Sequence, residues 1–312
     1  MSLPASLQRA VDSARMLNRP RAEGRVRAIR GIAIHVAGLS AAIGDTCTID
    51  AEGGKLPLPA EVVGFDKDDA VVMALGDAHR VAPWDRVHND HRPLAVPIGA
   101  GLLGRVVDAL GRPLDGGPPI QGALRPLTGD APSPLSRAPI HQPVETGVAA
   151  IDGMLTLGKG QRVGIFAGSG VGKSTLMGAI ARSKAGQVNV IALIGERGRE
   201  VGEFVTEALG KEGLQKSVVI ACTSDAAPML RLKAPLTAVT IAEAFRAQGA
   251  DVLFMMDSVT RYAMAVREVG LAAGEPPTLR GYPPSLFASL PRLVERLGSD
   301  GTGTITGLFT VL

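Results

Sequence analysis

The most constraining feature of the sequence is a glycine-rich stretch, Ala-Gly-Ser-Gly-Val-Gly-Lys-Ser, at residues 167–174. An apolar segment precedes it and a helical segment follows, which is the setting of a phosphate-binding P-loop; alanine at the first position is a common relaxation of the strict pattern. Glycines let successive backbone N–H groups point at phosphate oxygens, and the helix directs its positive end toward the same anion. The residues expected to bind the phosphates are Ala167, Gly168, Ser169, Gly170, Val171, Gly172, Lys173, Ser174 and Thr175.

Side chains in and beyond this stretch are candidates for charge neutralisation and metal binding. Lys173 is expected to neutralise charge between the β- and γ-phosphates, and the Ser174 hydroxyl to ligate Mg²⁺. A second Mg²⁺ ligand is needed on a neighbouring strand. Asp257 follows five apolar residues at a predicted carboxyl end, where ligands of α/β sheets gather. An aspartate here could instead cap the next helix, but the P-loop favours the metal role.

Hydrolysis also needs a group that orients or deprotonates the attacking water. Glu196 directly follows a predicted strand at 188–194, so its carboxylate is a candidate, and the neighbouring Arg197 could stabilise phosphate charge. On local sequence alone, residues 195–200 are explained equally well as a polar turn in which Arg199 and Glu200 pair.

The chain after residue 160 alternates between strand and helix patterns. Continuous apolar strands separated by helices predict an α/β fold with a parallel sheet covered by helices on both faces. The predicted strands are 162–167, 188–194, 218–222 and 252–256, and the predicted helices are 174–182, 201–209, a long helix ending near 248 and one starting at 258.

The first third of the chain has a different organisation. Apolar residues three and four apart predict an amphipathic helix over residues 1–20. Short segments of period two, separated by turn clusters, then predict a small β-barrel or sandwich within 21–93. Glycine- and proline-rich loops open the remaining segment, 94–312, which holds the P-loop.

Charge is concentrated at the N-terminus. Residues 1–30 hold seven arginines and two acidic residues, a net charge of +5 in a chain whose total is +3. This arm could dock on an acidic partner or an anionic membrane face, or it could be a solvated helix flank.

Composition excludes several classes of protein. There is no apolar run of the ~18 residues that a membrane span needs, and the N-terminus lacks a secretory signal, so we expect a cytoplasmic protein. Cys47 and Cys222 are too few for a disulfide framework or a four-thiolate zinc site, and each is expected to be buried. His88 and His91 are interpreted as part of a solvated linker. Arg280 could contact nucleic acid or a partner, or it could simply cap an element; 3% aromatic residues are few for a single-strand binder.

Longer segments resemble a known family. FAGSGVGKST at 166–175, GERGREVGEF at 195–204, residues 255–277 and residues 280–298 are similar to the flagellar type III export ATPases, which are related to the catalytic subunit of rotary ATP synthases. The likeness continues through 101–116 and the N-terminal region. It implies a six-stranded β-barrel, then a RecA-like P-loop domain with a mostly parallel sheet, and a C-terminal helical domain that binds export substrates and chaperones.

The resemblance also implies roles for individual residues, with ATP as substrate and Mg²⁺ as cofactor. Glu196 corresponds to the catalytic carboxylate and Lys173 to the phosphate lysine. Ser174 and Asp257 correspond to the Mg²⁺ partners. Arg197 and Arg261 correspond to charge stabilisers near the phosphates.

The implied function is Mg-dependent ATP hydrolysis that energises flagellar protein export. The resemblance implies a homo-hexamer, a stator-like regulatory subunit on the N-terminal helix, and docking at the cytoplasmic export gate on the inner membrane. Alternatives are a virulence type III secretion ATPase, a rotary ATP synthase subunit and an RNA translocase. Nucleic acid is the least expected partner because aromatic residues are few and the net charge beyond residue 30 is −2.

The end of the chain departs from the family pattern. Residues 302–312 predict a buried strand without a following turn, so we interpret the sequence as truncated within the RecA-like domain, 94–312. In the family, the arginine finger, the aromatic residue that packs on adenine and the helical domain lie further on. We therefore expect residues 1–312 alone to bind Mg-ATP weakly and to hydrolyse it slowly.

Overall fold

The computed structural model describes residues 23–51, 57–168 and 170–312. The chain divides into two compact units, Met1–Arg92 and Pro93–Leu312. The amphipathic helix expected at 1–20 lies outside the described residues, as does Ser169. Among the helices of the described ranges, none combines the length and the apolar character needed to cross a membrane.

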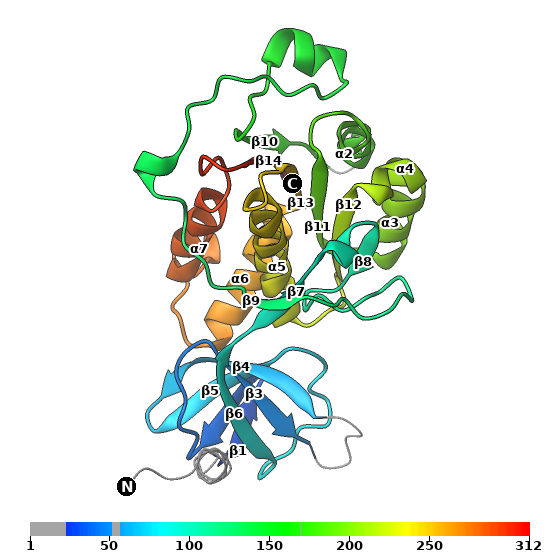
Figure 1. The fold of residues 1–312 in the computed structure, drawn as a ribbon. Helices are drawn as coiled ribbons and strands as arrows, with labels where there is room; N and C mark the ends of the chain where they lie inside the picture. Colours follow the sequence, from blue (N-terminus) through cyan, green and yellow to red (C-terminus); the bar gives the residue numbers. More distant parts are fainter. Residues whose placement is uncertain (1–22, 52–56, 169) are drawn as a thin grey trace, which may run out of the picture. The chain divides into compact units, whose positions relative to one another are not determined.

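The first unit contains a closed six-stranded barrel with the strand order β1-β2-β5-β4-β3-β6 (Figure 1). Alternate side chains of a strand point to opposite faces, so the period-two pattern places Val26, Ile34 and Val72 in the interior. The expected β-barrel is confirmed. Its strands are β1 (Glu23–Arg30), β2 (Ala33–Ala37), β3 (Asp45–Asp50), β4 (Leu58–Asp66), β5 (Asp69–Ala74) and β6 (Arg86–Pro93).

Two segments of the barrel correct the sequence analysis. His88 and His91 lie in strand β6 rather than in a linker, and Nε2 of His88 lies 2.9 Å from Oδ2 of Asp50. Part of the arginine-rich arm forms β1, where Arg27 pairs with Asp69 at 3.1 Å. Both strands are rich in polar residues because their outer faces meet water, which hides the apolar alternation.

The second unit is built on a six-stranded sheet with the order β10-β14-β13-β11-β12-β8. All five neighbouring pairs are parallel, which confirms the expected sheet. Strand β8 falls where only loops were expected. The strands are β8 (Arg105–Val107), β10 (Arg162–Phe166), β11 (Val188–Glu196), β12 (Ser217–Thr223), β13 (Asp251–Asp257) and β14 (Thr304–Val311), beside a two-stranded sheet of β7 (Ala95–Ile98) and β9 (Ala123–Pro126).

Helices cover both faces of this sheet, with α2, α3 and α4 on one side and α5, α6 and α7 on the other (Figure 1). Strand β11 shows why its sequence is a continuous apolar run. Val190 and Ile194 pack in the core on one face of the sheet, and Ile191 and Leu193 pack in the core on the other. The helices are α2 (Lys173–Arg182), α3 (Gly198–Glu203), the π-helical η4 (Phe204–Leu209), α4 (Gly210–Gln215), α5 (Pro228–Arg246), α6 (Val259–Ala272) and α7 (Pro284–Glu295).

The helix expected at 201–209 is longer than its apolar pattern indicated. It begins at Gly198, continues through the π-helical η4 and α4, and ends at Gln215. Cys47 and Cys222 are both buried, as expected. Short helical turns are η1 (Ala100–Leu102), η2 (Pro134–Ser136), η3 (Ile151–Leu155) and η5 (Leu279–Gly281).

Candidate active site

The P-loop connects the end of β10 to the start of α2. Gly170 and Gly172 have φ angles of 78° and 89°, a region that strains residues with a side chain, so this turn depends on glycine at both positions. Ala167 donates its N–H to the carbonyl of Val311 at 3.1 Å, and the Val171 side chain is mostly exposed; neither lines the cavity described below. The P-loop residues that do line it are Gly168, Gly170, Gly172, Lys173, Ser174 and Thr175.

Asp257 is the last residue of β13, and its carboxylate faces the P-loop lysine. Nζ of Lys173 lies 2.6 Å from Oδ1 of Asp257, and the hydroxyl of Thr310 on β14 donates to the same oxygen at 2.8 Å. Ser258, and not Asp257, caps helix α6 by accepting a hydrogen bond from the backbone N–H of Arg261 at 3.3 Å. The alternative interpretation of Asp257 as a helix cap is therefore wrong.

Glu196 ends β11, the strand next to β13. The register of β11 on β12 shifts between Ile194 and Glu196, at Gly195, whose φ is 68°. Oε1 of Glu196 is buried and has no hydrogen-bond partner within the described chain. Burial, a hydrogen bond with Glu200 and the charge of Asp257 raise the pKa of Glu196 to about 7. A carboxyl group with this pKa and a free oxygen is suited to accept a proton from water near neutral pH.

Two arginines reach the same end of the sheet from different elements. Arg197, whose side chain is mostly exposed, lies 3.7 Å from Glu200. The stem of Arg261, on α6, packs against Gly195, and its buried Nε has no partner among the described residues. The alternative in which Arg199 pairs with Glu200 is wrong, because Arg199 pairs with Glu203 at 2.6 Å.

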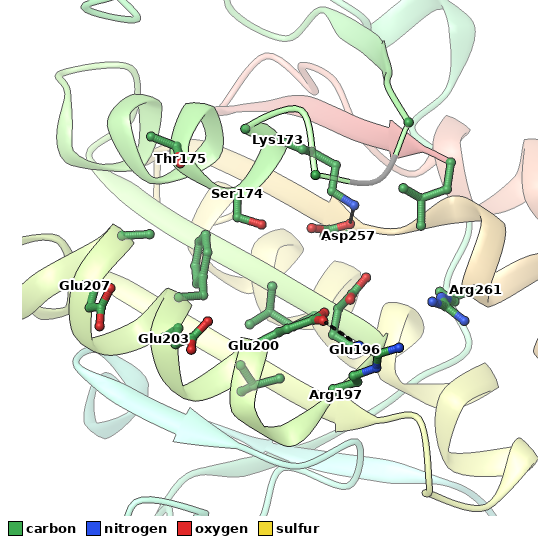
Figure 2. Close-up of a pocket in the computed structure, with 18 of the residues that line it drawn as sticks. Lys173, Ser174, Thr175, Glu196, Arg197, Glu200, Glu203, Glu207, Asp257 and Arg261 are labelled. Atoms are coloured by element: carbon green, nitrogen blue, oxygen red, sulfur yellow. Dashed lines mark ion pairs between the residues drawn. The ribbon is translucent and has the colours of Figure 1, made fainter.

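These side chains surround one cavity of about 660 Å³ (Figure 2). One wall of this cavity, which was not expected from the sequence, is formed by Glu200, Glu203 and Glu207 along α3 and η4. Their spacing of three and four residues places them on one helix face, and that spacing was visible in the sequence. The cavity can accommodate a phosphate chain together with a cation. Lys173 and the P-loop amides suit the phosphates, and the carboxylates that line the cavity suit the cation.

The comparisons with known proteins agree with this geometry. Residues 147–312 match the model of the ATP synthase alpha/beta family, nucleotide-binding domain. The chain is 51% identical over 309 residues to the flagellum-specific ATP synthase of Bacillus subtilis (strain 168), covering 98% of this chain and 70% of that protein. The chain belongs to the ATP synthase alpha/beta family. The expected P-loop ATPase, with ATP as its nucleotide, is thereby confirmed.

Secretion ATPases are also similar to this chain. The type 3 secretion system ATPase of Xanthomonas euvesicatoria is 51% identical over 294 residues, which are 93% of this chain and 66% of that protein. The assembled ATPase EscN of the enteropathogenic E. coli type III secretion system superposes with a TM-score of 0.87 at 45% identity, covering 93% of this chain and 69% of that one. This match confirms the barrel and RecA-like fold. The chain thus spans about two thirds of the length of these relatives.

Proposed function

We propose that this chain binds ATP and hydrolyses it by attack of water on the γ-phosphorus. Lys173 and the backbone amides of the P-loop from Gly168 to Thr175 hold the phosphates, whereas the Ala167 amide is already bonded to Val311. Glu196 orients the water and accepts its proton as the bond to the β–γ bridging oxygen breaks. Arg197 and Arg261 neutralise the charge that spreads over the γ-phosphoryl oxygens.

One observation carries this proposal. Lys173, Asp257 and Glu196 line a single cavity. Nζ of Lys173 lies 2.6 Å from Oδ1 of Asp257, and one buried oxygen of Glu196 has no partner within the described chain. A buried carboxylate oxygen without a partner costs stability, so its retention beside a phosphate-binding loop points to a partner that arrives with the substrate.

The donors at this position suit Mg²⁺. The Ser174 hydroxyl and the Asp257 carboxylate are hard oxygen donors of the kind that Mg²⁺ prefers, and Asp257 already holds a cation, the Lys173 ammonium. When bound there, Mg²⁺ would neutralise negative charge on the phosphate chain. We therefore assign Ser174 and Asp257 as its protein partners.

We further propose that hydrolysis energises protein export through the flagellar type III apparatus. The support is the flagellum-specific ATP synthase of B. subtilis, which matches 98% of this chain. A virulence type III system is the second candidate, because the Xanthomonas secretion ATPase has the same 51% identity.

The partners follow from the same relatives. EscN has been solved as an assembly and in complex with its central stalk EscO, which supports a homo-hexamer and a stalk-like partner here. A stator-like regulatory subunit on residues 1–20 is part of the same proposal. Export gate, chaperones and export substrates complete the proposed set. The proposed location is the cytoplasmic face of the inner membrane, with the arginine-rich arm on anionic lipid.

Glu196→Gln is the direct test of the mechanism. It removes the proton acceptor and keeps the shape, so ATP affinity should stay within about twofold while turnover falls by about 10²–10⁴-fold. The matched control is Glu212→Gln on the exposed face of α4, which should change neither quantity. Unchanged turnover of Glu196→Gln would remove Glu196 from the mechanism. Turnover stimulated by RNA, with steeply salt-dependent RNA binding, would favour a translocase instead.

A further inference from the structure

A second cavity, of about 570 Å³, lies behind the helix that forms the acidic wall of the first. Glu200, Glu203 and Glu207 line the phosphate cavity, whereas Gly198, Gly202 and Thr206, which follow each other at intervals of four, line the second. The remaining walls come from β8 and the segment 108–115 after it, from the carboxyl end of β12, and from the start of α5 with the residues just before it. The segment α3–η4 is therefore a partition between two cavities.

The second cavity exists because small side chains line it. A methyl group on Gly202 would meet no atom of the described chain within 4 Å, and Ala109, Ala221 and Ala226 contribute single methyl groups to the walls. Its volume is in the range of ~300–1,000 Å³ that is usual for sites of drug-sized ligands. An apolar molecule seated there would remove its own surface and that of the walls from water.

The polar residues of the lining restrict the charge of an occupant. The Arg105 guanidinium, which donates to Asp115 at 2.7 Å and 2.8 Å, holds the pKa of that carboxyl well below its usual range. Oδ1 of Asp108 accepts the backbone N–H groups of Leu110 and Arg112, both at 2.8 Å. The Thr206 hydroxyl donates to the carbonyl of Gly202 at 2.9 Å. Asp115, Asp108 and Thr206 thus already have hydrogen-bond partners within the protein. The surface of the cavity is otherwise mostly apolar, and its two carboxylates are those of Asp108 and Asp115.

We propose that this second cavity binds a small, mostly apolar organic molecule without negative charge, and that such a molecule changes the affinity of the phosphate cavity for nucleotide. Negative charge is disfavoured because the Asp108 carboxylate lines the cavity, whereas the charge of Asp115 is balanced by Arg105. The link between the cavities is Val201, which lines both, and the shared backbone of α3. The coupling rests on the proposed function, but the binding itself does not.

Binding is tested without nucleotide, using three naphthalene probes of equal ring size that differ in charge: 2-naphthalenemethanol, 2-naphthalenemethylamine and 2-naphthoate. Saturable 1:1 binding, followed by naphthalene fluorescence, is expected for the alcohol and the amine, with naphthoate weaker by about tenfold. Gly202→Phe fills the cavity and should weaken the alcohol by tenfold or more, whereas Gly202→Ala should keep its affinity within about threefold. Thermal unfolding of each variant verifies that it is folded, and Thr206→Phe repeats the blockade from a neighbouring position.

Binding that is absent, that is equal for naphthoate, or that both phenylalanine variants leave unchanged would overturn the site. Binding that disappears as the protein self-associates would also overturn it, by showing that a second copy covers the cavity. The coupling is then measured as ATP affinity with and without saturating 2-naphthalenemethanol, and we expect a change of about fivefold or more that Gly202→Phe abolishes. An unchanged ATP affinity would overturn only the coupling, and absent ATP binding would overturn the proposed function while leaving the probe results intact.

Discussion

The ammonium nitrogen of Lys173 lies 2.6 Å from Oδ1 of Asp257, so the proposed phosphate lysine is held by the proposed metal carboxylate. Phosphate and cation can occupy their places only when this ion pair opens. Each charged group then exchanges its protein partner for a partner on the substrate. The arrangement makes the binding of phosphate to Lys173 and of a cation to Asp257 mutually favourable, because either event frees the other group.

Asp257→Asn tests this exchange. The variant releases Lys173 from its ion pair, so ATP in the presence of EDTA should bind about two- to tenfold tighter than to the unaltered protein, while the gain from adding Mg²⁺ disappears. Isothermal titration with and without Mg²⁺ measures both effects. Asp251→Asn is the matched control, because Asp251 pairs with Lys159 at 2.6 Å at the opposite end of β13. Weaker metal-free binding in Asp257→Asn would contradict the exchange.

Glu196 should make both activity and stability depend on pH. Its pKa is raised to about 7, mainly by burial, so kcat/KM should rise with pH through about 7 as the carboxylate form appears. The folded protein binds this proton more tightly than the unfolded chain. The free energy of unfolding should therefore fall as pH rises from the usual carboxyl range to about 7.

Urea unfolding at pH 5 and pH 8 measures the contribution to stability. Glu196→Gln should be relatively more stable than the unaltered protein at pH 8 and should lose that advantage at pH 5. A variant with the same difference in stability at both pH values would show that burial of Glu196 does not raise its pKa.

Gly195 should be needed to place Arg261. A Cβ at Gly195 would lie 3.1 Å from Cβ of Arg261, and the φ of 68° strains any residue with a side chain. Gly195→Ala should lower stability by about 1–2 kcal/mol and should lower kcat more than it changes KM for ATP. Steady-state kinetics with a thermal melt separates the two effects. Gly101→Ala, where a Cβ meets no described atom within 4 Å, should leave kcat unchanged.

A buried ion pair in the second unit, Arg296 with Glu243, should contribute more to the free energy of unfolding than an exposed pair does. Nε and Nη2 of Arg296 each donate to a carboxylate oxygen of Glu243 at 2.8 Å, and both side chains are 5% exposed. Arg296→Ala leaves Glu243 buried without this partner and should cost about 3–5 kcal/mol of unfolding free energy. Replacing both residues, as Arg296→Met with Glu243→Leu, should recover most of the loss in urea titrations. The exposed pair of Arg199 and Glu203 offers a contrast, since Arg199→Ala should cost less than about 1 kcal/mol.

Segments with a strong local pattern were predictable. The P-loop followed from the spacing of its glycines, and β11 and β13 followed from continuous apolar runs buried on both faces. Strands β1, β6 and β8 were missed. In β1 and β6 the polar outer faces obscure the alternation, and β8 has only three residues and pairs with the distant β12. The β-propensity of a segment's own residues cannot show that the segment pairs with a strand distant in the sequence.

The composition of the site divides in the same way. Lys173, Ser174, Glu196 and Asp257 could be named from sequence, because each occupies a characteristic place relative to a strand end or a helix start. The carboxylate wall of Glu200, Glu203 and Glu207 was overlooked, because charged residues at helical spacing more often face solvent. Only the neighbouring α2 and the parallel sheet turn that face into the lining of a cavity.

By itself, the sequence determined which residues end the strands and which amides follow β10, since these depend on local order along the chain. The tertiary structure alone decided three things. Asp257 holds Lys173, one Glu196 oxygen has no partner among the described residues, and a partition of glycines and glutamates separates two cavities. The reason is physical: parallel pairing aligns the carboxyl ends of strands that are distant in sequence, and the packing of helices on both faces sets which side chains meet there.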